Sequence, residues 1–392
     1  MINKSKQKYF KILYYLLMFT VSGLVINQIV RFAQADEFEN AVVYRVCLVL
    51  FMLIQVPYFL LEKRYPLNAG IGYLISLISY ISLNDIAHIQ SIAAVLASLV
   101  WIFAFICGHF LVRYRVYDEH IKFNCILWFI ILFFVLNDVV SNYTRIIQAR
   151  SDVISANNVI YFGFPLLLAY NGKRISPFEL IITATMVGVA AFSFKRTTLI
   201  VAVVSVTLYY IGRLSLNGTP FKKIILIPIF IVLIALCVIV VDNYTGGHIS
   251  YRFSVIGSTG GNGRAEVWSK VISEMDRSNI STIFFGNGFN SVYNLFGISA
   301  HNDFLECYFD FGVIGLFFYL GIIFYIGKCL IHAKEMKIKE YPSFLGMFSS
   351  FIILSLFSHV FLYAFVSIPL FLFLGYLCKR SCIANEQIEV YG

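Results

Sequence analysis

The sequence predicts an all-α protein, a polytopic transmembrane helix bundle of about 12 spans with one large, partly helical loop on the outer face. Of the 392 residues, 59% are hydrophobic and only 13% are charged, and the mean hydropathy is +0.81. Soluble domains carry about 25% charged residues. The apolar runs repeatedly reach the roughly 20 residues that cross a hydrocarbon core about 30 Å thick. Basic residues punctuate these runs, as in the short loops of membrane proteins.

The apolar runs define the predicted spans along the whole chain. They lie at about 9–30, 41–61, 69–84, 92–112, 123–141, 155–171, 178–194, 197–213, 223–241, 306–327, 343–360 and 362–378. The first run resembles a signal peptide, but it is too long, and residues 28–30 offer no small-residue cleavage site. We therefore interpret it as a retained span, and residues 1–392 as a single integral membrane domain.

The distribution of basic residues predicts the sidedness of the bundle. With the N-terminus inside, 20 of the 30 Lys and Arg residues lie in inner segments, nine in outer segments and Arg45 within a span. Positive charge is enriched on the cytoplasmic side of membrane proteins, so both termini are expected there. The long polar segment 242–305 then becomes an extracytoplasmic loop of the bacterial cytoplasmic membrane. Because nucleotides are not available on that face, any reaction must use a substrate that is already activated.

The extracytoplasmic loop has two recognisable parts. In GSTGGNGRAEVWSKVISEMDRSN, hydrophobic residues at helical spacing from Val267 to Met275 predict an amphipathic helix that lies on the membrane or over a cavity. The later stretch IFFGNGFNSVYNLFGISA is apolar but too broken to span. The predicted loop therefore caps the bundle.

Several other classes of function are disfavoured. The net charge of +9 comes from basic residues between apolar runs, so nucleic acid is not an expected partner. The eight cysteines form no Cys-x-x-Cys pair, so we predict no metal site. GSTGGNGR resembles a phosphate-binding loop, but position 262 is Asn where the second glycine should stand, and no Lys followed by Ser or Thr comes after it. We expect no cofactor.

Basic residues on the outer face are the first candidates for a site. Lys195 and Arg196 lie between two spans, and Arg252 and Arg264 lie in the loop. Guanidinium groups pair bidentately with phosphate oxygens, and a helix N-terminus adds backbone donors. These four residues could hold a diphosphate at the membrane surface. The alternative is that Lys195 and Arg196 reach toward lipid headgroups.

The stretch HNDFLECYFD supplies the remaining candidates. The imidazole of His301 could take a proton from an attacking hydroxyl. Asn302 would alternatively serve as a helix cap. Asp303, Glu306 and Asp310 fall on one helix face and could act as a base, bind sugar hydroxyls or pair with the arginines. Solvation at the membrane interface is the alternative for the first two acids.

HNDFLECYFDFGVIGL resembles the motif of the O-antigen ligase and Wzy-type polysaccharide polymerase superfamily. The matching residues are His301, Asn302, Leu305, Gly312, Gly315 and Leu316. Three weaker matches precede it in the order of that family, namely FKRTTLI (194–200), GRAEVW (263–268) and FFGNGFNS (284–291). The resemblance covers about 190–320 and departs from the family at Lys195, where serine is common.

The resemblance implies a metal- and nucleotide-independent glycosyltransferase that uses an undecaprenyl diphosphate-linked oligosaccharide. It implies catalytic roles for Arg196 and Arg264, which would stabilise the leaving diphosphate, and for His301, which would position or deprotonate the acceptor. The implied substrate-binding residues are Lys195, Arg252, Asn302, Asp303 and Glu306. Membrane lipid, a flippase and a chain-length regulator are further expected partners.

Two choices remain open within and beyond this family. A polymerase joins lipid-linked repeat units into capsule, O-antigen or exopolysaccharide, whereas a ligase transfers the finished glycan to a terminal acceptor. The 39 Phe and 25 Tyr residues are typical of polymerases, which we favour. A lipid-linked oligosaccharide flippase is the alternative from another class, but the sequence lacks the internal repeats typical of transporters.

Overall fold

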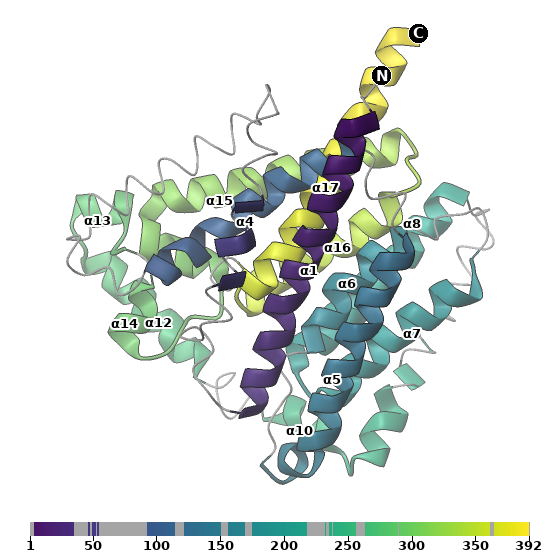
Figure 1. Ribbon diagram of the computed structural model, residues 1–392. Coiled ribbons are helices and arrows are strands. Elements are labelled where there is room, and N and C mark those ends of the chain that lie inside the picture. Colours follow the sequence, from purple (N-terminus) through teal and green to yellow (C-terminus); the bar gives the residue numbers. More distant parts are fainter. Residues whose placement is uncertain are drawn as a thin grey trace.

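A computed structural model describes 4–34, 46–47, 49–51, 53–54, 92–113, 121–149, 156–168, 175–217, 232, 235–236, 238–255, 263–288, 290–360 and 364–391. All regular secondary structure in these ranges is helical, with no strand (Figure 1). The predicted spans 41–61, 69–84 and 223–241 lie wholly or largely outside the described residues. The other nine predicted spans each coincide with a helix.

The described helices are numbered in their order along the chain. They are α1 (Lys4–Gln34), α4 (Ile92–Arg113), α5 (Ile121–Ala149), α6 (Asn157–Leu167), α7 (Pro177–Phe192), α8 (Arg196–Asn217), α10 (His248–Ser254), α12 (Arg264–Arg277), α13 (Ile280–Phe285), α14 (Ser291–Phe296), α15 (Asp303–Glu335), α16 (Tyr341–Phe357) and α17 (Ala364–Tyr391). The four helices from α10 to α14 divide the predicted loop 242–305 into short helical pieces.

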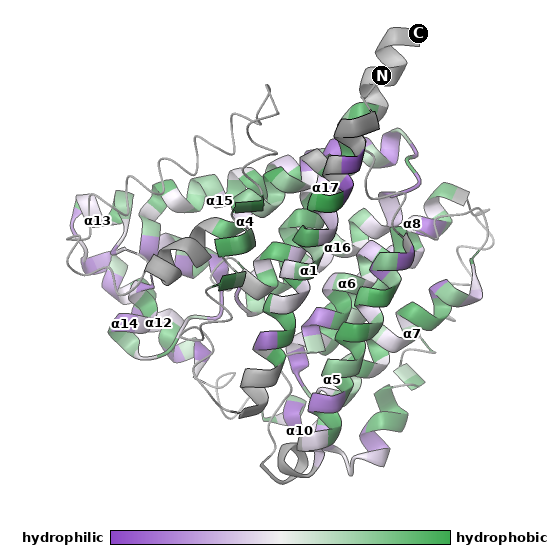
Figure 2. Ribbon diagram, in the orientation of Figure 1, coloured by the Kyte–Doolittle hydropathy of each residue, from purple (hydrophilic) through white to green (hydrophobic). Residues whose placement is uncertain are grey.

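The chain is a helical membrane protein. Among the described residues, four helical segments are long and apolar enough to cross a membrane, namely Lys122–Ser141, Arg196–Leu216, Asp303–Glu335 and Val366–Ile383. Lys11–Asn27, Val100–His109, Pro177–Phe192 and Tyr341–Phe357 are shorter apolar helices. Figure 2 shows that hydrophobic residues dominate the long helices.

The bundle contains two closely packed helix pairs, α4 with α17 and α8 with α16. Where α4 crosses α17, a Cβ atom on Gly108 would lie 2.1 Å from the carbonyl oxygen of Leu372. A Cβ atom on Gly375 would lie 1.9 Å from the carbonyl oxygen of Phe105. Only glycine allows two helix backbones to approach this closely, as is common between membrane helices.

A buried ion pair joins the C-terminal part of α8 to the N-terminal part of α7. Glu179 and Arg213 are buried, with 2.9 Å between Arg213 Nε and Glu179 Oε1, and Tyr209 donates to the same carboxylate oxygen at 2.8 Å. Glu179 also completes a capping box with Ser176 at the start of α7. A charge buried within a membrane bundle needs such partners because the apolar surroundings do not solvate it.

The helix α15 is broken at Gly312. This glycine has φ 68° and ψ −167°, a region that residues with a side chain almost never occupy. The helix therefore has a short first part, 303–311, and a long apolar second part, 313–335. The predicted span 306–327 therefore crosses the break, and the segment 303–311, which carries all three acids, precedes it.

The break holds the turn between α13 and α14. The backbone N–H of Asn287 donates to the carbonyl of Phe309 at 2.9 Å, and that of Gly288 donates to the carbonyl of Asp310 at 2.8 Å. Gly286 and Gly312 face each other across this contact, with Gly286 at φ 80°. Figure 1 shows α12, α13 and α14 gathered at this end of α15.

The predicted amphipathic helix is α12, and its apolar face is turned toward the protein rather than the lipid. Val267, Val271 and Met275 are buried, and they pack in one cluster with Val292 and Phe309. Ile272, which the prediction placed on the apolar face, is instead half exposed. Thus α12 covers the first part of α15.

We predict that Gly312→Ala and Gly286→Ala destabilise the protein. A Cβ atom at either position would lie 2.3 Å from backbone atoms across the contact. The backbone strain alone costs on the order of 1–3 kcal/mol. Thermal unfolding in detergent should show a lower midpoint for both variants.

Gly321→Ala is the matched control, because Gly321 lies in the same helix and an added Cβ would meet nothing within 4 Å. Alanine there should be neutral or stabilise by up to about 1 kcal/mol. Equal unfolding midpoints for all three variants would contradict the close contact at the break.

Candidate functional site

The site is built around the turn that precedes α15. His301 has φ 52°, a left-handed conformation that is uncommon for a residue with a side chain. The next residue, Asn302, caps α15, because its Oδ1 accepts from the N–H groups of Phe304 and Leu305 at 3.0 and 3.1 Å. The capping alternative is thus what the structure shows for Asn302. The turn presents the His301 ring at the N-terminus of α15.

Asp303 ties the start of α15 to the connection between α16 and α17. Its carboxylate is fully buried and accepts from the N–H of Val360 at 3.1 and 3.2 Å. The hydroxyl of Tyr319 donates to Asp303 at 2.8 Å and lies 2.7 Å from the hydroxyl of Ser355. This network fixes residues 358–360 against α15.

Glu306 lies between the turn and a second histidine. Its Oε1 accepts from the N–H of Ala300 at 2.6 Å and lies 3.7 Å from Nδ1 of His359. The rings of His301 and His359 stack with their centroids 4.4 Å apart and their planes at 37°. Both Glu306 and His359 are buried, whereas His301 is partly exposed. The histidine pair is thus open on the His301 side.

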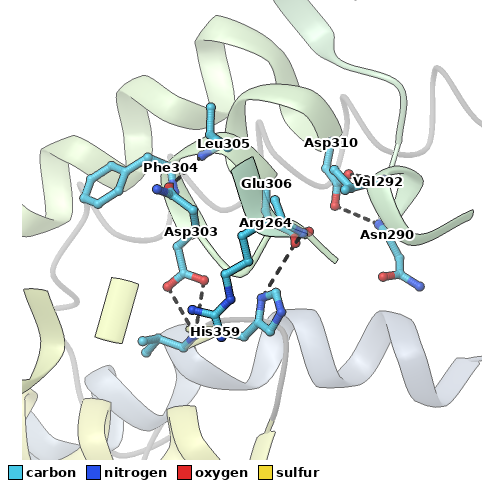
Figure 3. Close-up of polar contacts among 12 residues, drawn as sticks. Arg264, Asn290, Val292, Asp303, Phe304, Leu305, Glu306, Asp310 and His359 are labelled. Carbon is cyan, nitrogen blue, oxygen red and sulfur yellow. Dashed lines mark hydrogen bonds and ion pairs between the residues drawn. The ribbon is translucent and has the colours of Figure 1, made fainter. Parts of the chain in front are cut away.

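Asp310 has a different role from the other two acids. It accepts from the N–H groups of Asn290, Ser291 and Val292 at 2.8, 3.0 and 3.4 Å, at the start of α14 (Figure 3). A carboxylate is favoured there because it satisfies helix N–H groups that have no partner within the helix.

The substrate-binding roles expected for Asp303 and Glu306 stay a prediction, and the contacts that the structure shows for both are structural. Both side chains are 0% exposed and are engaged with the backbone of neighbouring segments. They position the turn, His359 and the residues around them. Asp303, Glu306 and Asp310 have the spacing of one helix face, but each carboxylate binds a different segment of the chain.

The helix α12 brings Arg264 to the histidines. Its Trp268 donates from Nε1 to the carbonyl of Ala300 at 2.7 Å, directly before His301. One turn earlier, Nη1 of Arg264 donates to the carbonyl of Phe357 at 2.8 Å, at the end of α16. Figure 3 shows Arg264 beside His359. Arg264 and Trp268 are four residues apart and therefore lie on one helix face.

The start of α8 also lies at this site. Thr197 lies 3.5 Å from the same carbonyl of Phe357, so the beginnings of α8 and α12 meet at the end of α16. The adjacent Lys195 is close enough to act electrostatically on both histidines. Lys195, Arg264, His301 and His359 form what we call the cation–histidine cluster.

Burial and positive charge keep both histidines neutral. Burial, followed by the charges of Arg264 and Lys195, lowers the pKa of His301 from 6.5 to about 4. Burial, His301 and the same two cations lower the pKa of His359 well below its ordinary value. A neutral imidazole can accept a proton, and the two cations can bind an anion beside it.

Arg196 and Arg252 are joined to each other. Nη1 of Arg196 donates to the backbone carbonyl of Arg252 at 3.1 Å, which links α8 to α10. The structure therefore brings Lys195, Arg264, His301 and Asn302 together, with Arg196 and Arg252 on the adjoining α8–α10 contact. Of the two neighbouring basic residues, Lys195 rather than Arg196 is in the cation–histidine cluster.

The predicted site does not include His359, which lies at the end of the predicted span 343–360 and is expected there to be a bundle contact or a helix-end residue. A usable signal was present, because counting spans from the cytoplasmic N-terminus places the connection after span 343–360 on the same face as the loop. His359 lies in that connection, next to the C-terminus of α16.

Comparisons with known proteins do not identify a family for this chain: no protein-family profile matches it, and no curated protein matches its sequence. Within the residues that the structure describes, no group of three or more His, Cys, Asp or Glu side chains is arranged to hold a metal ion. A function is therefore inferred from the cation–histidine cluster and the segments that form it.

We predict that the stability contributed by the two neutral histidines falls as the pH drops from about 6.5 toward 4. In this window the unfolded chain binds protons on residues 301 and 359, whereas the folded protein resists protonation of both rings. The contribution of the two histidines to stability is thus complete above pH 6.5 and is lost on acidification. Thermal unfolding in detergent across this range measures the effect.

His301→Asn is the matched variant, because asparagine tolerates the left-handed conformation and does not titrate. Its stability should decline less than that of the wild type between pH 6.5 and 4. An equal or steeper decline in the variant would show that His301 is not held neutral in the folded protein.

Proposed function

We propose that the chain is a polysaccharide polymerase, which joins undecaprenyl diphosphate-linked oligosaccharide repeat units by glycosyl transfer. We further propose that it has about 12 spans in the bacterial cytoplasmic membrane, with both termini in the cytoplasm and 242–305 on the outer face. The donor is a sugar already activated on a lipid diphosphate, which is the form in which an activated sugar can reach that face.

The observation that carries this proposal is the meeting of four segments that are far apart in sequence. FKRTTLI opens α8, GRAEVW opens α12, FFGNGFNS connects α13 to α14, and HNDFLECYFDFGVIGL forms the start of α15. Trp268 links the second segment to the fourth, and the N–H groups of Asn287 and Gly288 link the third to the fourth. Thr197 and Arg264 link the first and second to the end of α16.

The cation–histidine cluster fits the chemistry of this transfer. The acceptor hydroxyl oxygen forms a bond to the anomeric carbon of the donor glycan as the bond from that carbon to the diphosphate oxygen breaks. The hydroxyl proton passes to the neutral ring of His301. The departing diphosphate keeps the bonding electrons and stays on its lipid, with Arg264 and Lys195 balancing its charge.

The other groups have positioning roles in this proposal. His359, held by Glu306, supports one face of the His301 ring. Arg196 and Arg252 join α8 to α10 and extend the basic surface beside the cluster. The adjacent ends of α1 and α17 in Figure 1 agree with both termini being on one side of the membrane.

We predict that Arg264→Ala and His301→Ala abolish long-chain surface glycan. Loss of one charge-stabilising donor reduces a rate by about 10²–10³, and loss of a general base by about 10²–10⁴. Surface glycan from cells that express each variant at the wild-type protein level should appear on gels as single-repeat material.

Lys270→Ala is the matched control, because Lys270 lies on the same helix as Arg264 but is exposed and pairs with Glu266 on the outer face of α12. It should leave the glycan pattern unchanged. Normal long chains in Arg264→Ala and His301→Ala would overturn the assignment. Long lipid-linked chains that never reach their final acceptor would identify a ligase, and repeat units stranded on the cytoplasmic face would identify a flippase.

A further inference from the structure

The helices α13 and α14 carry a face of large apolar side chains that the described protein does not cover. Its members, which we call the α13–α14 apolar face, are Ile280, Phe284, Phe285, Tyr293 and Leu295, together with Ile298 just after α14. Ile280 is 76% exposed and Leu295 is 57% exposed. Apolar patches of this kind are rare on surfaces that face water and mark a contact with another apolar phase.

This face is continuous with the lipid-facing surface of α15. Beyond the break, α15 exposes Val313, Phe317, Phe324 and Ile331, which recur at intervals of four and seven residues and so form one stripe. The stripe begins directly after Gly312, which packs against the backbone of Phe284 in α13. The apolar side chains of α13 therefore begin where the apolar stripe of α15 begins.

The neighbouring helix α12 differs from α13 and α14 in its exposed surface. Its outer face carries charged residues, including the exposed pair of Glu266 and Lys270. Figure 1 shows α13 and α14 at the edge of the molecule, with α14 next to α12. The exposed side chains of α12 are mainly polar or charged and suit water, whereas those of α13 are mainly apolar and suit hydrocarbon.

The turn between α13 and α14 also meets the main requirement for non-helical backbone at membrane depth. Such backbone is tolerated only where protein groups satisfy its hydrogen bonds. The N–H groups of Asn287 and Gly288 bind carbonyls exposed by the break in α15, and the carboxylate of Asp310 binds the first N–H groups of α14. Lipid would therefore not leave these polar groups without partners.

We propose that the α13–α14 apolar face inserts into the membrane leaflet beside α15 and contacts lipid acyl chains. The segment 280–298 then forms a short re-entrant element rather than part of an aqueous loop. It holds the start of α15 at the level of the headgroups, next to the cation–histidine cluster. This inference concerns the membrane contact alone and does not depend on the proposed reaction.

The test uses the wild-type protein in lipid bilayer discs that contain phosphatidylcholine with a photoreactive diazirine at the middle of the acyl chain. After illumination, mass spectrometry maps the labelled residues. The expected result is labelling within 280–298 at a yield comparable to that of the α15 stripe at Phe317 and Phe324. The exposed face of α12, from Glu266 to Glu274, should remain unlabelled and serves as the internal control.

Labelling of the α15 stripe without labelling of 280–298 would overturn the proposal. The proposal would also be overturned by cross-links between two copies of the protein through Phe284 or Leu295, with no labelling of these residues by the lipid probe. A second copy would then cover the face. Neither result depends on glycan synthesis, so failure of this inference is distinguishable from failure of the proposed function.

Discussion

The break of α15 at Gly312 is the constraint on which the rest of the site depends. It frees the carbonyls of Phe309 and Asp310 to bind the turn at Asn287 and Gly288, and it directs the first part of the helix away from the second. The carboxylate of Asp310 then holds the start of α14. Because α12 packs on this first part through Val271 and Met275, one glycine conformation sets the position of the whole cap.

The charged groups of the site divide into two kinds by burial. The acids Asp303, Glu306 and Asp310 are fully buried and bind backbone N–H groups, so they position segments of the chain. Arg264 and Lys195 are partly exposed and act on the histidines. This arrangement places positive charge at the open side of neutral imidazoles. Such a site attracts an anion and can still accept a proton.

Sequence periodicity could predict the long helices, because apolar runs of about 20 residues have few alternatives in a membrane. It could also predict α12 from the spacing between Val267 and Met275. It could not predict the break in α15, since FDFGVIGL reads as continuous helix and only the contact with Gly286 makes the left-handed conformation of Gly312 favourable. The burial of Asp303 and Glu306 could not be predicted either, because it depends on α16 and residues 358–360 and is a tertiary effect.

The helix α12 packs beside the start of α15, and we propose that both lie on the outer side of the membrane. The most direct measurement labels Lys270→Cys, on the exposed face of α12, with a membrane-impermeant maleimide. Labelling should occur in intact spheroplasts above the background of the wild-type cysteines, and it should be lost in sealed inside-out vesicles. Labelling only in the inside-out vesicles would place α12 and the cation–histidine cluster in the cytoplasm and would contradict the account.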